Sequence, residues 1–597
     1  MQGDEIEDEG AYRSTWLSPN IEINVAVWHL WDTAYYNSDN SKLHQMKKII
    51  LFILTVLLLN HAYSQNETQA NYGSISGNFQ SEAQYYITDS LIGATAPIEK
   101  TLANSWANIT YTLKNFSAGV RYEGYLNSIL GYPNSGGRND GIGFPHRWAN
   151  FVVDKFEFTV GNFYEQFGNG LVLRSYEEKR LGVDNSLDGF RVKYNPAQGV
   201  YLKTLIAKQR FYWEHGPGIV RGFDGEIQFN DLIEKFAESD LRISLGGSFV
   251  SKFQKEESPI YNLPKNVAAS AGRIDIRYNG LAINSEYAYK INDPGADNNY
   301  IFKNGQAFMV NASYSQKGLG IVLSTKWVDN MAFRSDRNAS LTDLNINLLP
   351  ELTRNHVYML PAFYPYASQP KGEWGAKAEI MYKIPKGNVL GGKYGTTILV
   401  NYSRVHNIDK QAINDTLPLD APGTLGYNTS FFSIGKELYF QDAHIEINKR
   451  WTKKLYTNLS YVNLLYNYNI LRGTTGHDNV NAHIAIADIT YKFKPQLALK
   501  SEFQHMYTKQ DEGSWAMALF ELTTSGWFFT VLDNWNYGNP DKNHRPHYFN
   551  VGFGHISGAT RIQLTYGKTR AGVMCIGGVC RNVPASNGIS LSISSTF

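Results

Sequence analysis

The chain has 597 residues and a formal net charge of +2, and charged residues make up 18% of it, against roughly 25% in typical soluble domains. Aromatic residues reach 14%, while the chain contains only 2 Cys, so a disordered chain and a disulfide scaffold are both excluded. The longest charge-free apolar stretch, Ile49–Leu59, is too short to cross a bilayer as a helix, which needs roughly 20 residues. A large, mostly β protein remains.

Residues 46–64 have the three parts of a secretory signal peptide. Met46 is followed by Lys47 and Lys48, then by the apolar run 49–59 and a small-residue cleavage site that ends at Ser64. Signal peptides begin at the N-terminus of a protein, yet the acidic stretch 1–45 precedes this one. We therefore interpret 1–45 as a spurious extension and expect the mature protein to span 65–597.

The mature chain repeats a two-residue alternation of apolar and polar side chains. It holds over 75–87, 241–249, 273–278 and 373–383. Period two predicts strands with one apolar and one polar face.

Short and long connections alternate between these strands. Short ones include 154–155, 278–280, 451–454 and 494–496, and long ones include 331–371, 408–437, 469–480 and 571–585. This arrangement is typical of transmembrane barrels, with short periplasmic turns and long extracellular loops. The sequence therefore predicts an all-β fold, an antiparallel transmembrane barrel of roughly 24 strands, with 22–26 compatible with the pattern.

Aromatic residues and the C-terminus favour a barrel in the outer membrane of a Gram-negative cell over a soluble sandwich or solenoid. Trp residues recur near strand ends, as expected of interfacial girdles. The last alternating strand ends on Phe597, which resembles the assembly signal of outer-membrane barrels. The expected partners are therefore outer-membrane lipid and the barrel-assembly machinery, and the export signal and low net charge argue against nucleic acid.

Charges of both signs are interleaved on the polar faces, which we expect to line the lumen. They can pair across strands or form a selectivity lining. A selective pore would favour one sign, so pairing is the favoured interpretation. The residues are Arg121, Glu123, Arg242, Arg273, Asp275, Arg277, Glu286, Lys377, Glu379, Glu446, Arg450, Lys500, Glu502 and Arg561.

No pattern in the sequence predicts an enzyme. His444 and Glu446 share one strand face, but nothing nearby supplies a nucleophile or a third metal ligand. No nucleophile elbow, zinc-protease motif or phosphate loop is present. We expect no catalytic residues, no metal site and no cofactor.

The two cysteines lie close together in the last long connection. Cys575 and Cys580 flank a Gly-Gly pair that permits a tight reversal. An exported chain meets an oxidising compartment, which favours a disulfide. Free thiols and a two-ligand metal site are the alternatives.

Three segments resemble those of an uncharacterised family of outer-membrane barrels from the Bacteroidota. They are Gly161–Leu187, His356–Glu373 and the Cys575–Arg581 loop with the terminal strand. The resemblance covers most of the mature chain. It implies a fold and a compartment but no reaction.

The first two of these segments are too irregular to be lipid-facing strands. Segment 164–186 mixes charged residues with glycines, and 351–373 contains Pro361 and Pro365. Either they pack above the barrel as extracellular loops, or they fold inward and narrow the lumen, where irregular backbone is tolerated. The candidate lumen or loop contacts are Arg174, Glu177, Glu178, His356, Tyr358, Tyr364 and Tyr366.

Two functions from different classes fit this fold. The first is a porin-like channel or transport protein for a hydrophilic solute or polymer, because a barrel of this size encloses a wide lumen. The second is a structural or scaffold barrel whose loops present a surface to partner proteins or glycans. A barrel-embedded hydrolase is a third, weaker hypothesis.

Overall fold

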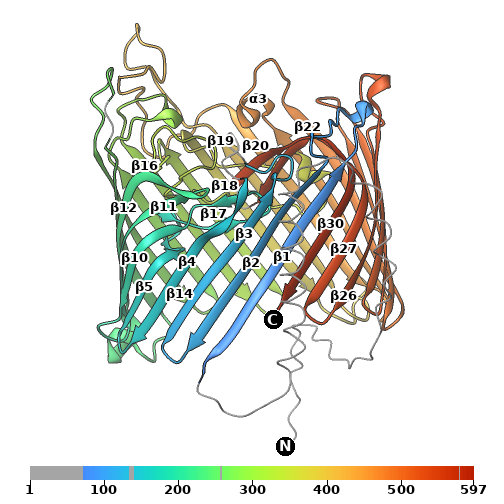
Figure 1. Ribbon diagram of the computed structural model, residues 1–597, viewed down its shortest axis with the longest axis horizontal. Coiled ribbons are helices and arrows are strands. Elements are labelled where there is room, and N and C mark those ends of the chain that lie inside the picture. The colour runs from blue at the N-terminus through green and yellow to red at the C-terminus, as the bar shows by residue number, and fades with distance from the viewer. Residues whose placement is uncertain (1–71, 134–139, 256–257, 577–578) are drawn as a thin grey trace, which may run out of the picture. The chain divides into compact units, whose positions relative to one another are not determined.

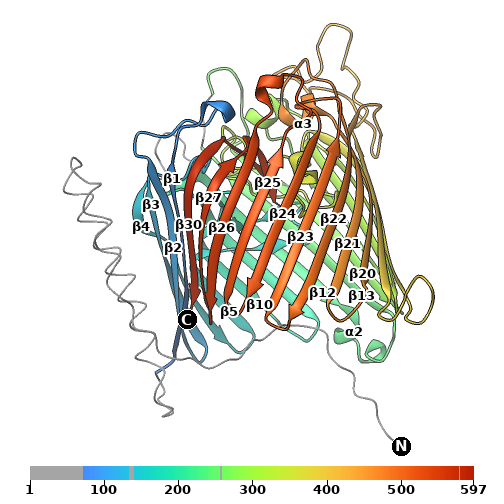
Figure 2. The same ribbon diagram turned by 90° about the vertical axis from the view of Figure 1, so that its right-hand side faces the viewer.

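The computed structural model describes residues 72–133, 140–255, 258–576 and 579–597, without the side chains of 574–576 and of 579. Within them, 24 strands form one antiparallel sheet that closes where the first strand, β1 (Ser74–Tyr86), pairs with the last, β30 (Ser586–Thr596). The barrel confirms the predicted fold class and strand number. Figures 1 and 2 show the strands inclined along its wall. The predicted extension and signal peptide lie outside the described residues.

The other wall strands follow each other in chain order around the barrel and run from 8 to 15 residues in length. They are β2 (Thr101–Leu113), β3 (Phe116–Leu126), β4 (Gly141–Val153), β5 (Phe156–Phe163), β10 (Leu187–Tyr194), β11 (Val200–Phe211), β12 (Glu214–Gln228), β13 (Arg242–Phe253), β14 (Asn266–Tyr278), β15 (Leu281–Lys290), β16 (Gly305–Gln316), β17 (Leu319–Asp329), β18 (Gly372–Ile384), β19 (Thr396–His406), β20 (Leu438–Arg450), β21 (Leu455–Tyr466), β22 (Val480–Lys494), β23 (Leu497–Tyr507), β24 (Trp515–Thr524), β25 (Trp527–Trp535), β26 (His547–Ser557) and β27 (Thr560–Thr569).

Short helices and strand pairs occupy the connections. They are η2 (Ser90–Ile92), α2 (Phe229–Leu232), η3 (Glu234–Phe236), η4 (Ala296–Asn298), η5 (Pro361–Phe363), α3 (Tyr468–Arg472), η6 (Lys542–His544), and the pairs β6 (Gln166–Phe167) with β7 (Leu173–Arg174), β8 (Glu177–Glu178) with β9 (Val183–Asp184), and β28 (Gly572–Ile576) with β29 (Val579–Val583). None of the helices in the described part of the chain has the length and hydropathy needed to cross a bilayer.

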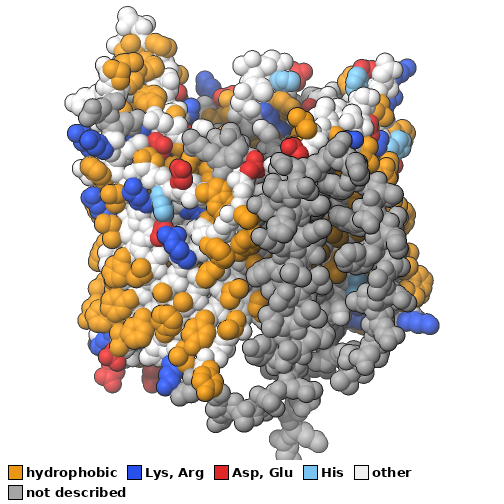
Figure 3. Space-filling view, viewed as in Figure 1, with side chains coloured by type: hydrophobic (Ala, Val, Ile, Leu, Met, Phe, Trp, Pro, Cys, Tyr) orange, Lys and Arg blue, Asp and Glu red, His pale blue; other side chains and the backbone are white. Residues whose placement is uncertain are grey.

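The outer face of the wall is apolar. Large hydrophobic side chains at alternate strand positions, such as Phe190, Ile206 and Phe223, are 42%, 50% and 49% exposed. Figure 3 shows hydrophobic side chains gathered over the outer face of the strands. An exposed apolar belt of this extent is the surface that lipid covers in a transmembrane barrel.

Connection length separates the two ends of the barrel. Most turns at the end where β1 begins and β30 ends have two to five residues, while the connections at the other end include 330–371 and 407–437. Two turns at the first end are longer than the sequence analysis expected. Residues 229–241 contain α2 and η3, and 385–395 form an irregular connection.

The inner face differs from the expected polar lining near the long loops. There, the lumen-facing positions Val462, Leu464, Ile484 and Ile486 are apolar and at most 4% exposed. The polar lining predicted from the alternation is present toward the short-turn end. The apolar inner wall exists because parts of the chain pack against it from inside the barrel.

Candidate functional site: two segments inside the barrel

The first segment inside the barrel is 164–186, which joins β5 to β10. Its side chains Phe167, Leu171, Val172 and Leu173 are fully buried and form one core with lumen-facing residues of β11–β17. Phe167 lies so close to Gly222 of β12 that a Cβ there would stand 2.9 Å from the ring. This core fixes the segment against the inner wall.

The second segment inside the barrel is 330–371, which joins β17 to β18. Its first half binds the first segment through the backbone: the N–H of Arg174 donates to the carbonyl of Ile346 at 2.8 Å, and the N–H of Leu348 donates to that of Gly170 at 3.2 Å. The amide of Asn347 also donates to the carbonyl of Leu171 at 2.9 Å. The two segments therefore form one body in the lumen.

The second half of this segment packs against the opposite part of the wall. Leu360, Tyr364 and Tyr366 are buried in a core with lumen-facing residues of β19–β24. The backbone N–H of Leu360 donates to Oε1 of Gln504 on β23 at 2.9 Å. The apolar inner wall of these strands is thus matched by apolar side chains from the segment.

A buried charge cluster anchors the first segment. Glu123 of β3 forms an ion pair with Arg121 at 2.7 Å and accepts a hydrogen bond from Arg210 of β11 at 2.6 Å. Arg121 also binds Glu177 at 2.7 Å, and both arginines bind Asp184. β4, β5 and β10 lie between β3 and β11 in the sheet, so the contact spans the lumen side of three strands.

The pKa values of two carboxyl groups of the first segment are shifted in opposite directions by this cluster. Burial raises the pKa of Glu177, and this effect outweighs the nearby guanidinium of Arg121. Burial acts on Asp184 in the same sense, but Arg210 and Arg121 together hold the pKa of its carboxyl below the usual value. Within the first segment, Asp184 is therefore the carboxylate that joins Glu123 in neutralising the two arginines.

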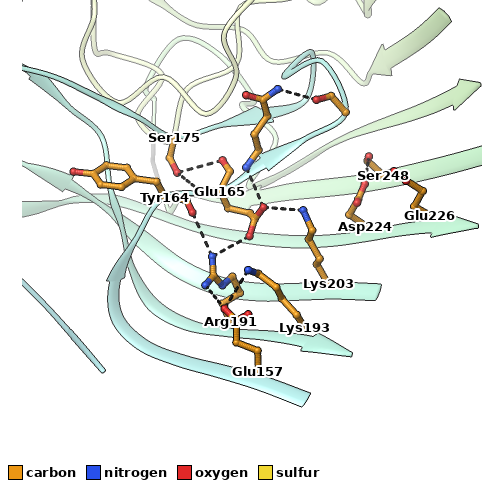
Figure 4. A network of polar contacts seen from close by, with 12 residues as sticks. Glu157, Tyr164, Glu165, Ser175, Arg191, Lys193, Lys203, Asp224, Glu226 and Ser248 are labelled. Carbon is orange, nitrogen blue, oxygen red and sulfur yellow. Dashed lines mark hydrogen bonds and ion pairs between the residues drawn. The ribbon is translucent and has the colours of Figure 1, made fainter. Parts of the chain in front are cut away.

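A second polar network lies closer to the short-turn end (Figure 4). Glu165 of the first segment accepts from Arg191 of β10 and from Lys203 of β11, both at 3.0 Å. Arg191 continues to Glu157 of β5 at 2.9 Å, and Lys193 binds the same carboxylate at 3.1 Å. The lumenal charges here pair with each other, as the sequence analysis favoured.

Glu373 anchors the end of the second segment. It is fully buried and forms an ion pair with Lys326 of β17 at 2.5 Å. It also accepts hydrogen bonds from the backbone N–H of Gln369 at 2.6 Å and from the hydroxyl of Tyr366. Lys326 also donates to Oγ of Ser368 at 2.7 Å. Each of these groups holds the returning chain to the start of β18.

The three charged candidate contacts have different partners in the structure. Glu177 pairs with the wall, whereas Glu178 pairs with Arg180 of its own segment at 3.5 Å and Arg174 lies over the ring of Tyr176. Of these three charges, only Glu177 forms an ion pair with a wall strand among the described residues.

The three tyrosine candidates also differ in their surroundings. Tyr364 and Tyr366 are 2% and 3% exposed, and their hydroxyls donate to Asp511 and Glu373. They are core residues and are not placed to touch a solute. Tyr358 is half-buried, donates to Asp488 of β22 at 3.4 Å, and lines an open cavity.

His356 binds the wall through Asp442 of β20, with 2.9 Å between Nε2 and the carboxylate. His444 lies beside it, with 5.5 Å between the ring centroids. No nucleophilic side chain is bonded to this pair, and the described residues contain no group of three or more His, Cys, Asp or Glu that could hold a metal ion.

The remaining predicted residues lie at the seam and in the last long connection. Phe597 exchanges two backbone hydrogen bonds with Gly77, at 2.9 and 3.0 Å, and so completes the closure of β30 on β1. The backbones of β28 and β29 pair Cys575 with Cys580. The Cys575 side chain lies outside the described residues, and the disulfide stays a prediction.

Several residues of the site were missed by the sequence analysis, notably Asp184, Arg210, Lys326 and the half-segment 330–350. One signal was available. In Ile484–Ala487, both faces of the strand are apolar, which is typical of strands that are covered on both sides.

The sequence as a whole matches one described family, over residues 46–597. The chain belongs to DUF6029, a family of unknown function. This membership confirms the expectation of an uncharacterised family. No curated protein matches the sequence of this DUF6029 member.

Solved barrel structures resemble the DUF6029 chain in fold. The translocation pore of the P pilus usher PapC is 10% identical, with 87% of this chain and 99% of that chain covered at a TM-score of 0.42. The siderophore receptor PirA from Pseudomonas aeruginosa is 9% identical, with 89% and 81% covered at a TM-score of 0.37. OccAB4 from Acinetobacter baumannii is 10% identical, with 76% and 100% covered at 0.32. Similarities at this level carry no information about solute or partner.

Proposed function

We propose that the protein is a transport barrel of a Gram-negative outer membrane, of the kind found in Bacteroidota, that passes a hydrophilic solute through a lumen narrowed by its own chain. The apolar outer belt supports a place in lipid. The signal peptide and the terminal Phe597 predicted from the sequence support export and assembly. The family itself supplies no reaction.

The observation that carries the proposal is the distribution of polar side chains inside the barrel. The two segments pack against β11–β24, near the long loops. Along the seam, the lumen-facing positions of β30 are mostly Ser and those of β1 are mostly polar, and Ser594, Ser76 and Asn78 are exposed. A water-accessible wall of this kind suits passage of a hydrophilic solute better than a purely structural barrel.

Planar-bilayer recording of the purified full chain tests this function. We expect steady currents of small amplitude for a barrel with 24 strands, because the two segments occupy much of the lumen. Correctly folded protein that gives no current and no solute flux in proteoliposomes would contradict transport. That result would favour the scaffold alternative, in which the loops bind surface partners.

A further inference from the structure

Two cavities open below the segments, toward the short-turn end of the barrel. One, of 430 Å³, lies between the first segment and β11–β15 and is lined by Lys203, Asp224, Glu226 and Arg273. The other, of 390 Å³, lies between Tyr358 of the second segment and β18–β22. Both volumes fall within the range of pockets that bind small molecules, about 300–1,000 Å³.

The cations of the first cavity are neutralised by the protein. Arg273 binds Asp224 at 2.7 Å and Glu226 at 3.1 Å. Lys203 binds Glu165 at 3.0 Å, and Figure 4 shows its amine turned toward that carboxylate. This cavity has no free positive charge to offer a ligand.

The second cavity differs because its arginine has no carboxylate partner among the described residues. The guanidinium of Arg450 lies 4.8 Å from the ring centroid of Tyr394 and 5.0 Å from that of Tyr456. Its Nε donates to the carbonyl of Thr452 at 3.3 Å. These contacts hold the planar group in place and leave both Nη atoms for a ligand, in the geometry that binds carboxylate or phosphate bidentately.

The acidic groups near this arginine are already engaged elsewhere. Asp488, which lines the cavity, is bound by Lys500 at 3.3 Å. Glu446 is bound by Arg354 at 2.8 Å. Lys383, which also lines the cavity, forms no ion pair within the described part of the chain and adds a second positive charge.

The rest of the lining suits a sugar. Tyr358 presents an aromatic surface, and the amide of Asn458 and the hydroxyls of Thr397, Thr457 and Thr490 lie around the cavity. Hydroxyl and amide groups beside an aromatic ring can bind the hydroxyls and the apolar face of a sugar ring.

We propose that this cavity binds an anionic sugar from the short-turn side of the barrel, with the carboxylate or phosphate on Arg450 and Lys383 and the ring against Tyr358. The assignment deepens the proposed function, since it names a solute class for the same lumen. A sugar acid and a sugar phosphate share the required chemistry, and the experiment distinguishes them.

Titration calorimetry of the full chain in lipid nanodiscs tests the assignment, with glucuronate, glucose 6-phosphate, glucose and inorganic phosphate as probes. We expect one or both of the anionic sugars to bind at least tenfold more tightly than glucose and than inorganic phosphate. The tighter of the two identifies the anion that the site prefers. Equal affinity for glucose, tighter binding of inorganic phosphate, or no binding of either anionic sugar would overturn the proposal.

Matched variants locate the binding. Arg450→Gln should weaken anionic-sugar binding at least tenfold, while Arg561→Gln, at another lumen-facing arginine outside the cavity, should leave it unchanged. Lys383→Gln, at an exposed position, repeats the test if Arg450→Gln does not fold. Unchanged binding in a folded Arg450→Gln or Lys383→Gln protein would contradict the site. Binding of an anionic sugar without flux would refute the proposed transport function but support the site. Flux without binding would support transport but refute the site.

Discussion

Glu123 of β3 is the residue on which Arg121 and Arg210 converge. It is 2% exposed and lies within 2.7 Å of both guanidinium groups. Removing one partner of a buried ion pair leaves a charge without compensation, at a cost of about 3–5 kcal/mol. The cluster therefore joins two strands that do not pair with each other.

We predict that Glu123→Gln lowers the free energy of unfolding by about 3 kcal/mol. Denaturant titration in lipid vesicles measures the change. The control is Glu379→Gln on β18, whose ion pairs at 3.6 Å involve side chains that are 21–25% exposed and should be worth about 0–1 kcal/mol. Equal losses in the two variants would show that the cluster is not an anchor.

Glu351 of the second segment gives a pH dependence. Burial raises its pKa from 4.5 to about 7, and a hydrogen bond from Asn355 opposes the shift only partly. Because the folded pKa lies above the unfolded one, the contribution to stability is full below pH 4.5 and is lost as the pH rises through 7.

The melting temperature of the wild type should therefore fall, relative to Glu351→Gln, between pH 5 and pH 8. Scanning calorimetry of both proteins across this range measures the difference. Glu234→Gln, at an exposed position on η3, serves as the control and should track the wild type. If the difference in melting temperature between the wild type and Glu351→Gln stays constant with pH, the Glu351 carboxyl is not buried.

At the scale of elements, part of the second segment can be replaced without changing any residue of the wall strands. All 24 strands pair through their own ladders, and 356–369 lies between β17 and β18. Replacing 356–369 by a short Gly/Ser linker should raise the single-channel conductance several-fold, because the lumen beside β19–β24 becomes open to water.

The matched control shortens 412–418, a largely exposed part of the 407–437 connection, and should leave the conductance unchanged. Heat-modifiable migration confirms that both proteins are folded. A folded 356–369 replacement with wild-type conductance would mean that this part of the chain does not narrow the lumen.

The closing strand makes a prediction about assembly. The Phe597 ring lies over Gly77 of β1, where an added Cβ would stand 2.6 Å from it. Phe597→Asp places a charge at this seam and should reduce the folded, heat-modifiable fraction severalfold, while Phe597→Tyr should retain it. The comparison isolates the ring, because the backbone bonds to Gly77 are available to both. Normal folding of Phe597→Asp would show that the Phe597 ring is not needed for closure and assembly of the barrel.

At the scale of the whole molecule, the barrel could be predicted and its contents could not. Alternation such as that in 75–87 predicts which side chains face out of the barrel, and the connection lengths predict the order of the strands. The pairing of Glu123 with Arg210 joins residues 87 positions apart, and no local pattern encodes it. The same holds for Tyr358 and Asp488, which are 130 positions apart.

The candidate contacts show a second limit. Tyr358, Tyr364 and Tyr366 are alike in sequence, but the last two fill a core while the first lines a cavity. The difference arises from the inner wall that each one meets. Tyr364 and Tyr366 face the apolar side chains of β19–β24, whereas Tyr358 lies nearer the polar end of the lumen.

The central claim is that 164–186 and 330–371 lie inside the barrel and bind each other there. Electron cryo-microscopy of the full chain in lipid nanodiscs tests it most directly. The map should show continuous density for both segments within the ring of strands, with contacts from Glu177 to Arg121 and from Leu360 to Gln504. Density for these segments above the extracellular rim, over an empty lumen, would contradict the account.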